Sequence, residues 1–136
     1  HLIRQIRFAE NDQVKLDVKP QVQDQIPLSK SAVQAVREGL RAVTTRGTAG
    51  GVFRIPGLIP VAGKTGTVQT RSGAPGDKAS QHAWFVGYGP FEGEPKDQLV
   101  IGVIIERGVG GSVGAAPIAR DVFVKYSQKL KAGTVN

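Results

Sequence analysis

"VAGKTGTVQT" at residues 61–70 is the stretch that decides between two fold classes. It contains Gly-Lys-Thr, which can end a phosphate-binding loop, within a run of valine and threonine that favours a β-strand. In the first interpretation a helix begins at the lysine, whereas in the second the lysine lies inside a strand. The neighbouring residues discriminate between the two.

The phosphate-loop interpretation fails on spacing. The motif needs four residues between its first glycine and the Gly-Lys pair, but five separate Gly57 from Gly63. Those five are apolar and include Pro60, which has no N–H to offer a phosphate. The sequence after Thr65 is rich in β-branched residues and should not begin the helix whose N-terminus would hold the phosphate.

The strand interpretation has a direct chemical consequence, because alternate side chains of a strand lie on opposite faces. One face is predicted to carry Thr65, Thr67 and Gln69, and the other Lys64, Gly66 and Val68. Gly66 would leave space beside Lys64 for a substrate or a partner side chain. A cation next to hydroxyls and strand amides suits a carboxylate or a developing oxyanion. The alternative, an ordinary strand whose lysine points to water, stays open on these residues alone.

The rest of the chain predicts two helices and two more strands. Ser31 with Gln34, or Ser29 alone, caps a helix whose apolar residues recur at helical spacing: Val33, Val36, Leu40 and Val43. The segment 52–60 contains two prolines and is predicted to be a loop or an edge segment. Strands are predicted at 82–89 and 98–105, and the continuous apolar run of the latter indicates a strand covered on both faces. The last helix carries one apolar stripe, formed by Ala115, Ala119, Val122, Phe123, Tyr126 and Leu130.

These elements give an α+β fold, in which helices flank an antiparallel sheet. The connections between the three strands are too short for parallel crossovers. We therefore expect extended and turn segments at 1–28, a helix at 29–44, the three-stranded sheet across 61–105 and the C-terminal helix at 115–131.

Composition limits the function classes. The net charge of +7 comes from scattered basic residues, which favours a solvated surface over a nucleic-acid site. The chain has no cysteine, and neither His1 nor His82 has neighbours at metal-ligand spacing, so we expect no metal and no cofactor. No apolar run approaches the roughly 20 residues of a membrane span. The chain begins without methionine and contains none, so we expect a segment of a longer protein.

Three segments together resemble the class B penicillin-binding proteins: AGKTGTVQT at 62–70, HAWFVGYGP at 82–90 and LVIGVIIERG at 99–108. The glycine-rich bend before the last helix adds to the resemblance, which is nearest to the elongation-type enzyme. The family members are D,D-transpeptidases that cross-link peptidoglycan and are acylated by β-lactams. The resemblance implies the C-terminal part of a penicillin-binding, serine-transpeptidase fold at the periplasmic face of the bacterial inner membrane.

The family uses three motifs, S-x-x-K, S-x-N and K-T-G, and only K-T-G is present in this chain. The resemblance implies that Lys64 supplies positive charge to the substrate carboxylate and that the Thr65 and Thr67 hydroxyls hold it. Gly66 completes the substrate-binding set, and the Thr67 backbone N–H would form half of an oxyanion hole. The nucleophile and general base would come from an upstream part of the domain, so the segment alone is expected to be inactive.

The partners implied are peptidoglycan stem peptides, β-lactams and that upstream part carrying S-x-x-K and S-x-N, with neither nucleic acid nor membrane contacted by this segment. Two alternatives stay open. One is a non-catalytic binding module of the same fold, and the other is a basic domain that binds acidic polymers. The missing upstream part also predicts an apolar sheet surface left uncovered.

Overall fold

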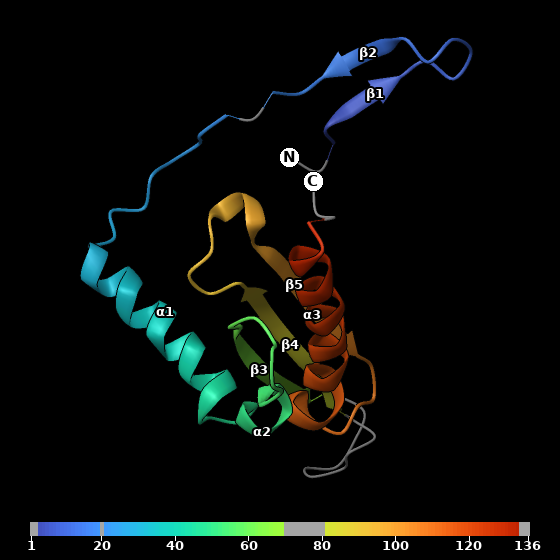
Figure 1. Cartoon of the computed structure of the whole chain (residues 1–136). Helices are drawn as coiled ribbons and strands as arrows, with labels where there is room; N and C mark the ends of the chain where they lie inside the picture. Colours follow the sequence, from blue (N-terminus) through green and yellow to red (C-terminus); the bar gives the residue numbers. More distant parts are fainter. Residues whose placement is uncertain (1–2, 20, 70–80, 134–136) are drawn as a thin grey trace.

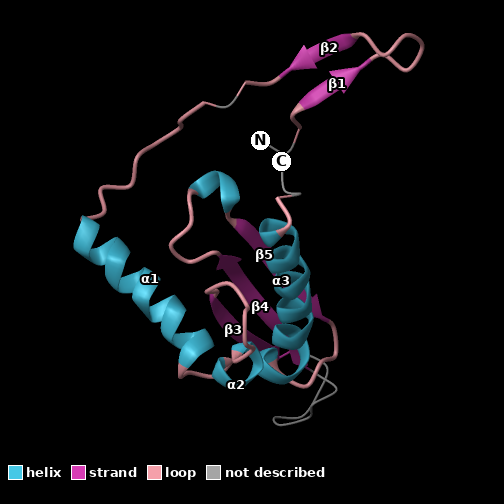
Figure 2. Cartoon of the chain, viewed as in Figure 1, coloured by secondary structure: helices cyan, strands magenta, loops and turns pink. Residues whose placement is uncertain are grey.

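A three-stranded antiparallel sheet with helices on one face forms the body of the protein (Figures 1 and 2). The computed structural model describes residues 3–19, 21–69 and 81–133. The strands are β3 (Ala62–Gln69), β4 (Gln81–Gly89) and β5 (Leu99–Ile105), in the order β3-β4-β5. Each neighbouring pair is antiparallel, which confirms the predicted α+β class.

One face of this sheet carries the core. Phe85 of β4 stacks on Phe53 with ring centroids 5.2 Å apart, and Phe53 meets Phe123 edge to face at 6.3 Å. Phe53 belongs to the short helix α2 (Gly50–Phe53), and Phe123 to the C-terminal helix α3 (Ala116–Lys131). Phe85 and Phe123 are fully buried, so this cluster fixes α2 and α3 against the sheet.

The opposite face of the sheet is bare among the described residues. Its exposed apolar side chains come from all three strands: Val68, Trp84, Val86, Val100 and Ile104. Val100, for example, is 70% exposed. The expectation of an uncovered apolar sheet surface is confirmed, and we refer to these five residues as the open face.

Helix α1 (Lys30–Thr45) lies beside β3 (Figure 1). Ser29 is the N-cap and accepts from the Ala32 N–H at 3.1 Å, so the cap is Ser29 and not Ser31. At the connection between β4 and β5, which contains the 3₁₀ turn η2 (Pro95–Asp97), Arg37 donates to the Phe91 carbonyl at 2.9 Å. The helix is thereby tied to the end of β4.

Four details of the sequence prediction are wrong. The side chains of β5 alternate between partly buried and exposed instead of being covered on both faces. Val33 and Val36 are 42% and 62% exposed, because the first half of α1 extends beyond the core. Val122 is 43% exposed, and the buried stripe of α3 runs instead through Ala116, Ala119, Phe123 and Ser127. The segment 52–60 is not all loop, since α2 extends into it.

The N-terminal part of the chain extends away from the body as a separate hairpin (Figure 1). Strands β1 (Gln5–Arg7) and β2 (Val14–Asp17) pair only with each other. Every residue of both strands is exposed, so the hairpin adds nothing to the core.

The glycine bend ends in one turn of π-helix, η3 (Gly111–Ala115), which rests directly on the backbone of β3 and β4. A Cβ on Gly111 would lie 2.4 Å from the Trp84 carbonyl oxygen and 2.8 Å from the Gly66 nitrogen. No residue with a side chain fits at those distances. The bend is therefore packed against the backbone of β3 and β4 on the core face, and we refer to this contact as the brace.

Replacing this glycine gives a test of the brace. Gly111→Ala should lower the free energy of unfolding by about 1–3 kcal/mol, because the added methyl must displace strand backbone. In the matched control Gly39→Ala, the methyl meets no atom within 4 Å, and it should stabilise α1 by up to about 1 kcal/mol. Urea unfolding of the two variants measures both changes. Equal effects would show that η3 does not press on the strands in solution.

Candidate active site

The K-T-G motif lies on β3, which is an edge strand of the sheet in the described part of the chain. Ala62 and Gly63 at its start are buried, Lys64 is exposed, Thr65 and Gly66 are part-buried, and every residue of the strand from Thr67 onward is exposed. The motif thus begins where β3 leaves the core. Because β3 is at the edge of the sheet, the side chains of the motif lie next to its free edge and alternate between the packed face and the open face.

Lys64 and Gly66 lie on the open-face side. They pair with Val86 and Trp84, which are 49% and 39% exposed. A Cβ on Gly66 would lie 3.3 Å from the Cβ of Trp84, so glycine keeps this part of the strand bare. Lys64 is exposed and its Nζ donates to the Thr65 carbonyl, and none of the ion pairs found among the described residues involves it. Its charge is available to an anion.

Thr65 and Thr67 lie on the other side of the strand, as their pairing with Phe85 and Ala83 requires. The Thr65 hydroxyl is 2.9 Å from that of Thr48, and the Thr67 hydroxyl accepts from the Gly111 N–H at 3.4 Å. Both threonines therefore have a hydrogen-bond partner within the chain. The alternation predicted for residues 64–69 is present, and it separates the lysine from the two hydroxyls across the strand edge.

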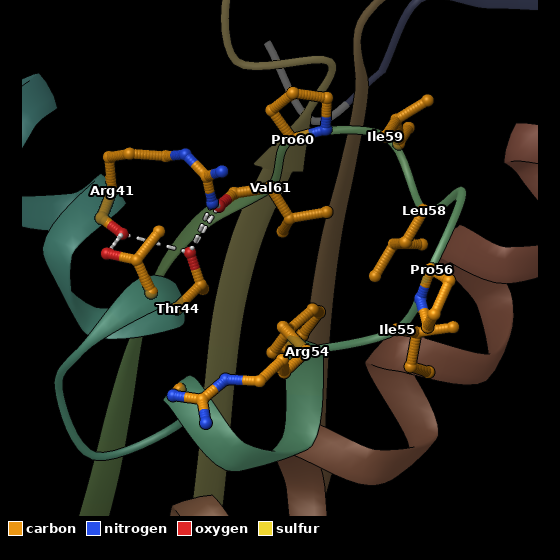
Figure 3. Close-up of a pocket in the computed structure, with 12 residues that line it drawn as sticks. Arg41, Thr44, Arg54, Ile55, Pro56, Leu58, Ile59, Pro60 and Val61 are labelled. Carbon is orange, nitrogen blue, oxygen red and sulfur yellow. Dashed lines mark hydrogen bonds between the residues drawn. The ribbon is translucent and has the colours of Figure 1, made fainter.

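The start of β3 is fixed by a buried clamp on one carbonyl. Arg41 donates to the Val61 carbonyl at 2.8 Å, and the Thr44 hydroxyl donates to the same oxygen (Figure 3). Thr44 is 3% exposed and Val61 is 1% exposed, so water cannot replace these bonds readily. The end of α1 thereby determines where β3 begins, three residues before Lys64.

A hollow borders this clamp, and none of the K-T-G residues lines it. It has a volume of about 650 Å³ and lies between the end of α1, α2 and the segment that leads into β3. Figure 3 shows its apolar residues in an arc on one side and the Arg41 and Arg54 guanidinium groups on the other. The sequence did not predict this hollow.

Other candidate groups have structural explanations. The His82 Nδ1 accepts from the Arg107 N–H at 3.2 Å, which agrees with a structural role for this histidine. Across residues 3–19, 21–69 and 81–133, no three His, Cys, Asp or Glu side chains gather in a way that could hold a metal. Within the same ranges, the helices are too short or too polar to cross a membrane.

The sequence matches the penicillin-binding protein transpeptidase domain over residues 1–124. Since this match covers most of the chain, the chain belongs to the family of penicillin-binding protein transpeptidase domains. The resemblance to class B enzymes predicted from the three strand segments is confirmed.

Two curated relatives carry the same name, peptidoglycan D,D-transpeptidase MrdA. The one from Haemophilus influenzae is 43% identical over 80 residues, which are 52% of this chain and 12% of the relative. The one from Acinetobacter baumannii is 37% identical over 97 residues, which are 65% of this chain and 14% of the relative. The chain therefore spans about an eighth of the length of these relatives.

Solved structures show the same fold. The D,D-transpeptidase domain of a peptidoglycan glycosyltransferase from Eggerthella lenta matches with a TM-score of 0.60 and 30% identity, covering 94% of this chain and 27% of that one. Pseudomonas aeruginosa PBP2, solved in complex with WCK 5153, matches with a TM-score of 0.59 and 29% identity. That match covers 86% of this chain and 22% of that one.

Sequence reasoning missed the residues that support the motif from elsewhere in the chain. Arg41 and Thr44 precede Val61 by 20 and 17 residues, and Thr48 precedes Thr65 by 17. Arginine and threonine residues at the end of a helical pattern, or just beyond it, carry no local signal for such contacts. Only the packing of the end of α1 beside β3 reveals them.

The clamp on Val61 can be tested with two adjacent threonines. Thr44→Val removes a buried donor at nearly constant volume and should cost about 1 kcal/mol of unfolding free energy. Thr45→Val is the matched control, because the Thr45 hydroxyl is exposed and bonds only to carbonyls of its own helix. Denaturant unfolding of both variants gives the comparison. An equal cost would indicate that the Thr44 bond to Val61 contributes nothing to stability.

Proposed function

We propose that strand β3 of this chain, which carries the K-T-G motif, forms one side of the active site of a peptidoglycan D,D-transpeptidase. We call this strand segment the K-T-G wall. The observation that carries the proposal is the position of K-T-G on an edge strand beside an uncovered apolar sheet face. The family match and the names of the relatives support the reaction class. The reaction is acyl transfer through a serine, and the serine belongs to an upstream part of the domain.

Lys64 is proposed as the cation that attracts the terminal carboxylate of the stem peptide and supports proton transfer near the nucleophile. Its exposure and the absence of a carboxylate partner in the described ranges favour this role. An ammonium group beside apolar side chains from which water is excluded attracts an anion more strongly than one in bulk water. Trp84 and Val86 would provide those apolar side chains once the open face is covered.

Thr65 and Thr67 are proposed to hold the same carboxylate by their hydroxyls, and Gly66 to allow its approach. A ligand that lies along the free edge of β3 can be reached by Lys64 from one side and by the threonines from the other. This geometry resembles the addition of a strand to a sheet edge, in which backbone groups bind an extended peptide. The bonds to Thr48 and Gly111 fix the hydroxyls in position beforehand.

The Thr67 backbone N–H is proposed as half of the oxyanion hole, with the N–H of the nucleophilic serine as the other half. Such a donor is worth on the order of 10²–10³ in rate, because it stabilises charge that develops only in the transition state. One of the two oxyanion-hole donors, without the nucleophilic serine, cannot bring about acyl transfer. The segment alone is therefore expected to be inactive.

The upstream part that carries S-x-x-K and S-x-N is proposed as the partner that covers the open face. Covering Val68, Trp84, Val86, Val100 and Ile104 would remove exposed apolar area that a folded domain rarely leaves in one patch. The same contact would bring the serine to the open-face side of β3, where Lys64 lies. The complete enzyme is proposed to act at the periplasmic face of the inner membrane on peptidoglycan stem peptides, and to be acylated by β-lactams.

A labelling experiment tests whether the active site is divided in this way. Fluorescent penicillin should acylate the protein that includes the upstream part and should leave the 136-residue segment unlabelled. Gel fluorescence after denaturation measures the covalent adduct. A folded longer protein that stays unlabelled would contradict the proposal. Binding to nucleic acid that weakens steeply with salt would favour a basic module instead.

Substitutions in the motif test the roles of its residues. In the protein with its upstream part, Lys64→Ala should lower the acylation rate on the order of 10²–10³, because the cation at the carboxylate is lost. Thr67→Ala keeps the backbone N–H and should have a smaller effect, of about tenfold. Lys96→Ala, at an exposed lysine of η2, is the control and should acylate normally. Stopped-flow acylation with a chromogenic β-lactam measures all three, and a normal rate for Lys64→Ala would refute its role.

A further inference from the structure

The hollow beside the Val61 clamp combines an apolar wall with two cations. The residues around it come from the end of α1, α2 and the segment before β3: Arg41, Thr44, Thr45, Gly50, Phe53, Arg54, Ile55, Pro56, Leu58, Ile59, Pro60 and Val61. None of them is acidic, and the sequence from residue 39 to residue 63 contains no Asp or Glu. An anion that entered the hollow would meet no repulsion from its lining.

The two arginines have different roles in this hollow. Arg41 uses Nη1 to bind the Val61 carbonyl and the Thr44 hydroxyl, so it is largely committed to the fold. Arg54 is exposed, and among the described residues it forms neither a hydrogen bond nor an ion pair. Its planar guanidinium is suited to a carboxylate, which it can bind through two parallel hydrogen bonds.

The size and shape of the hollow restrict the occupant. A volume of about 650 Å³ lies within the range of ligand sites and is enough for one or two apolar side chains with their backbone. The arc formed by Ile55, Pro56 and Leu58 gives apolar contact on one side, and Arg54 supplies charge on the other (Figure 3). The lining therefore matches a group that is both apolar and anionic.

We propose that this hollow is a docking site for an acidic peptide segment of a partner protein. An apolar side chain of the segment enters the arc, and a neighbouring Glu or Asp carboxylate binds Arg54. Charge complementarity favours an acidic partner, because the lining of the hollow contains two arginines and no acidic residue. The concave shape favours an inserted side chain over a flat lipid surface.

This site is distinct from the K-T-G wall and does not depend on the proposed acyl-transfer function. The clamp residues Arg41, Thr44 and Val61 line the hollow, and no K-T-G residue does. Peptide binding and penicillin acylation can therefore be measured separately on the same protein. A negative result for peptide binding would not contradict the proposed acyl transfer, and a negative result for acylation would not contradict the proposed peptide site.

The test uses the full-length protein that contains this chain and the peptide Leu-Glu-Leu-Glu amide, labelled with fluorescein at its N-terminal amine. A second peptide, with glutamine in place of each glutamate, is the neutral control of matched size. Fluorescence anisotropy should show binding of the acidic peptide and at least about tenfold weaker binding of the neutral one. Equal binding of the two peptides, or binding of neither, would overturn the proposal without any variant.

Variants then locate the site. Arg54→Gln should weaken binding of the acidic peptide by about tenfold. Arg4→Gln, which removes the same charge from the exposed N-terminal segment, should leave it unchanged. Arg54→Glu should reverse the preference, so that a peptide with lysine in place of glutamate binds better. Equal losses in Arg54→Gln and Arg4→Gln would contradict the proposal, as would anionic phospholipid vesicles that bind through Arg54 while the peptide does not.

Discussion

The register between β3 and β4 depends on one aromatic ring. Phe85 lies over the Gly63–Gly87 pair, where neither neighbour has a side chain. A Cβ on Gly63 would lie 2.5 Å from the Phe85 ring, and one on Gly87 would lie 2.7 Å from it. A shift of β3 by one residue would place a side chain where the ring lies and would exchange the two faces of the strand. Gly63, which at first suggested a phosphate loop, is therefore a packing residue.

This register sets the chemistry of the strand. With Gly63 opposite Gly87, Lys64 is opposite Val86 and faces the open side, while Thr65 and Thr67 face the core side. The strand has one end buried and one end exposed, so the motif lies where its backbone leaves the core. A lysine placed one position earlier would be buried against Phe85, and its charge would be costly to desolvate. The same aromatic contact that stabilises the core thus keeps the cation accessible.

Much of this arrangement could be predicted from sequence, because local pattern encodes it. The alternation of 82–89 and the β-branched run after Lys64 are period-two signals, and short connections leave only antiparallel pairing. The apolar pattern of a strand or helix could not show which of its faces are covered, because burial depends on whether another element packs against that face. The continuous apolar run of β5 is typical of a strand covered on both sides, yet every second side chain is exposed in the part of the chain that the structure describes. Val33 and Val36 are exposed for the same reason, since the spacing of a stripe carries no information on what lies against it.

The contacts that position the motif were beyond prediction for a different reason. Arg41, Thr44 and Thr48 act across 17 to 20 residues of sequence, through the way the end of α1 lies beside β3. Together with Gly111 they hold β3 at its first residues and at its middle, always from the core side. The open side of the strand contributes none of these contacts. The motif is thus fixed in place by its own chain on one side, and the other side, where Lys64 lies, is exposed in the described part of the chain.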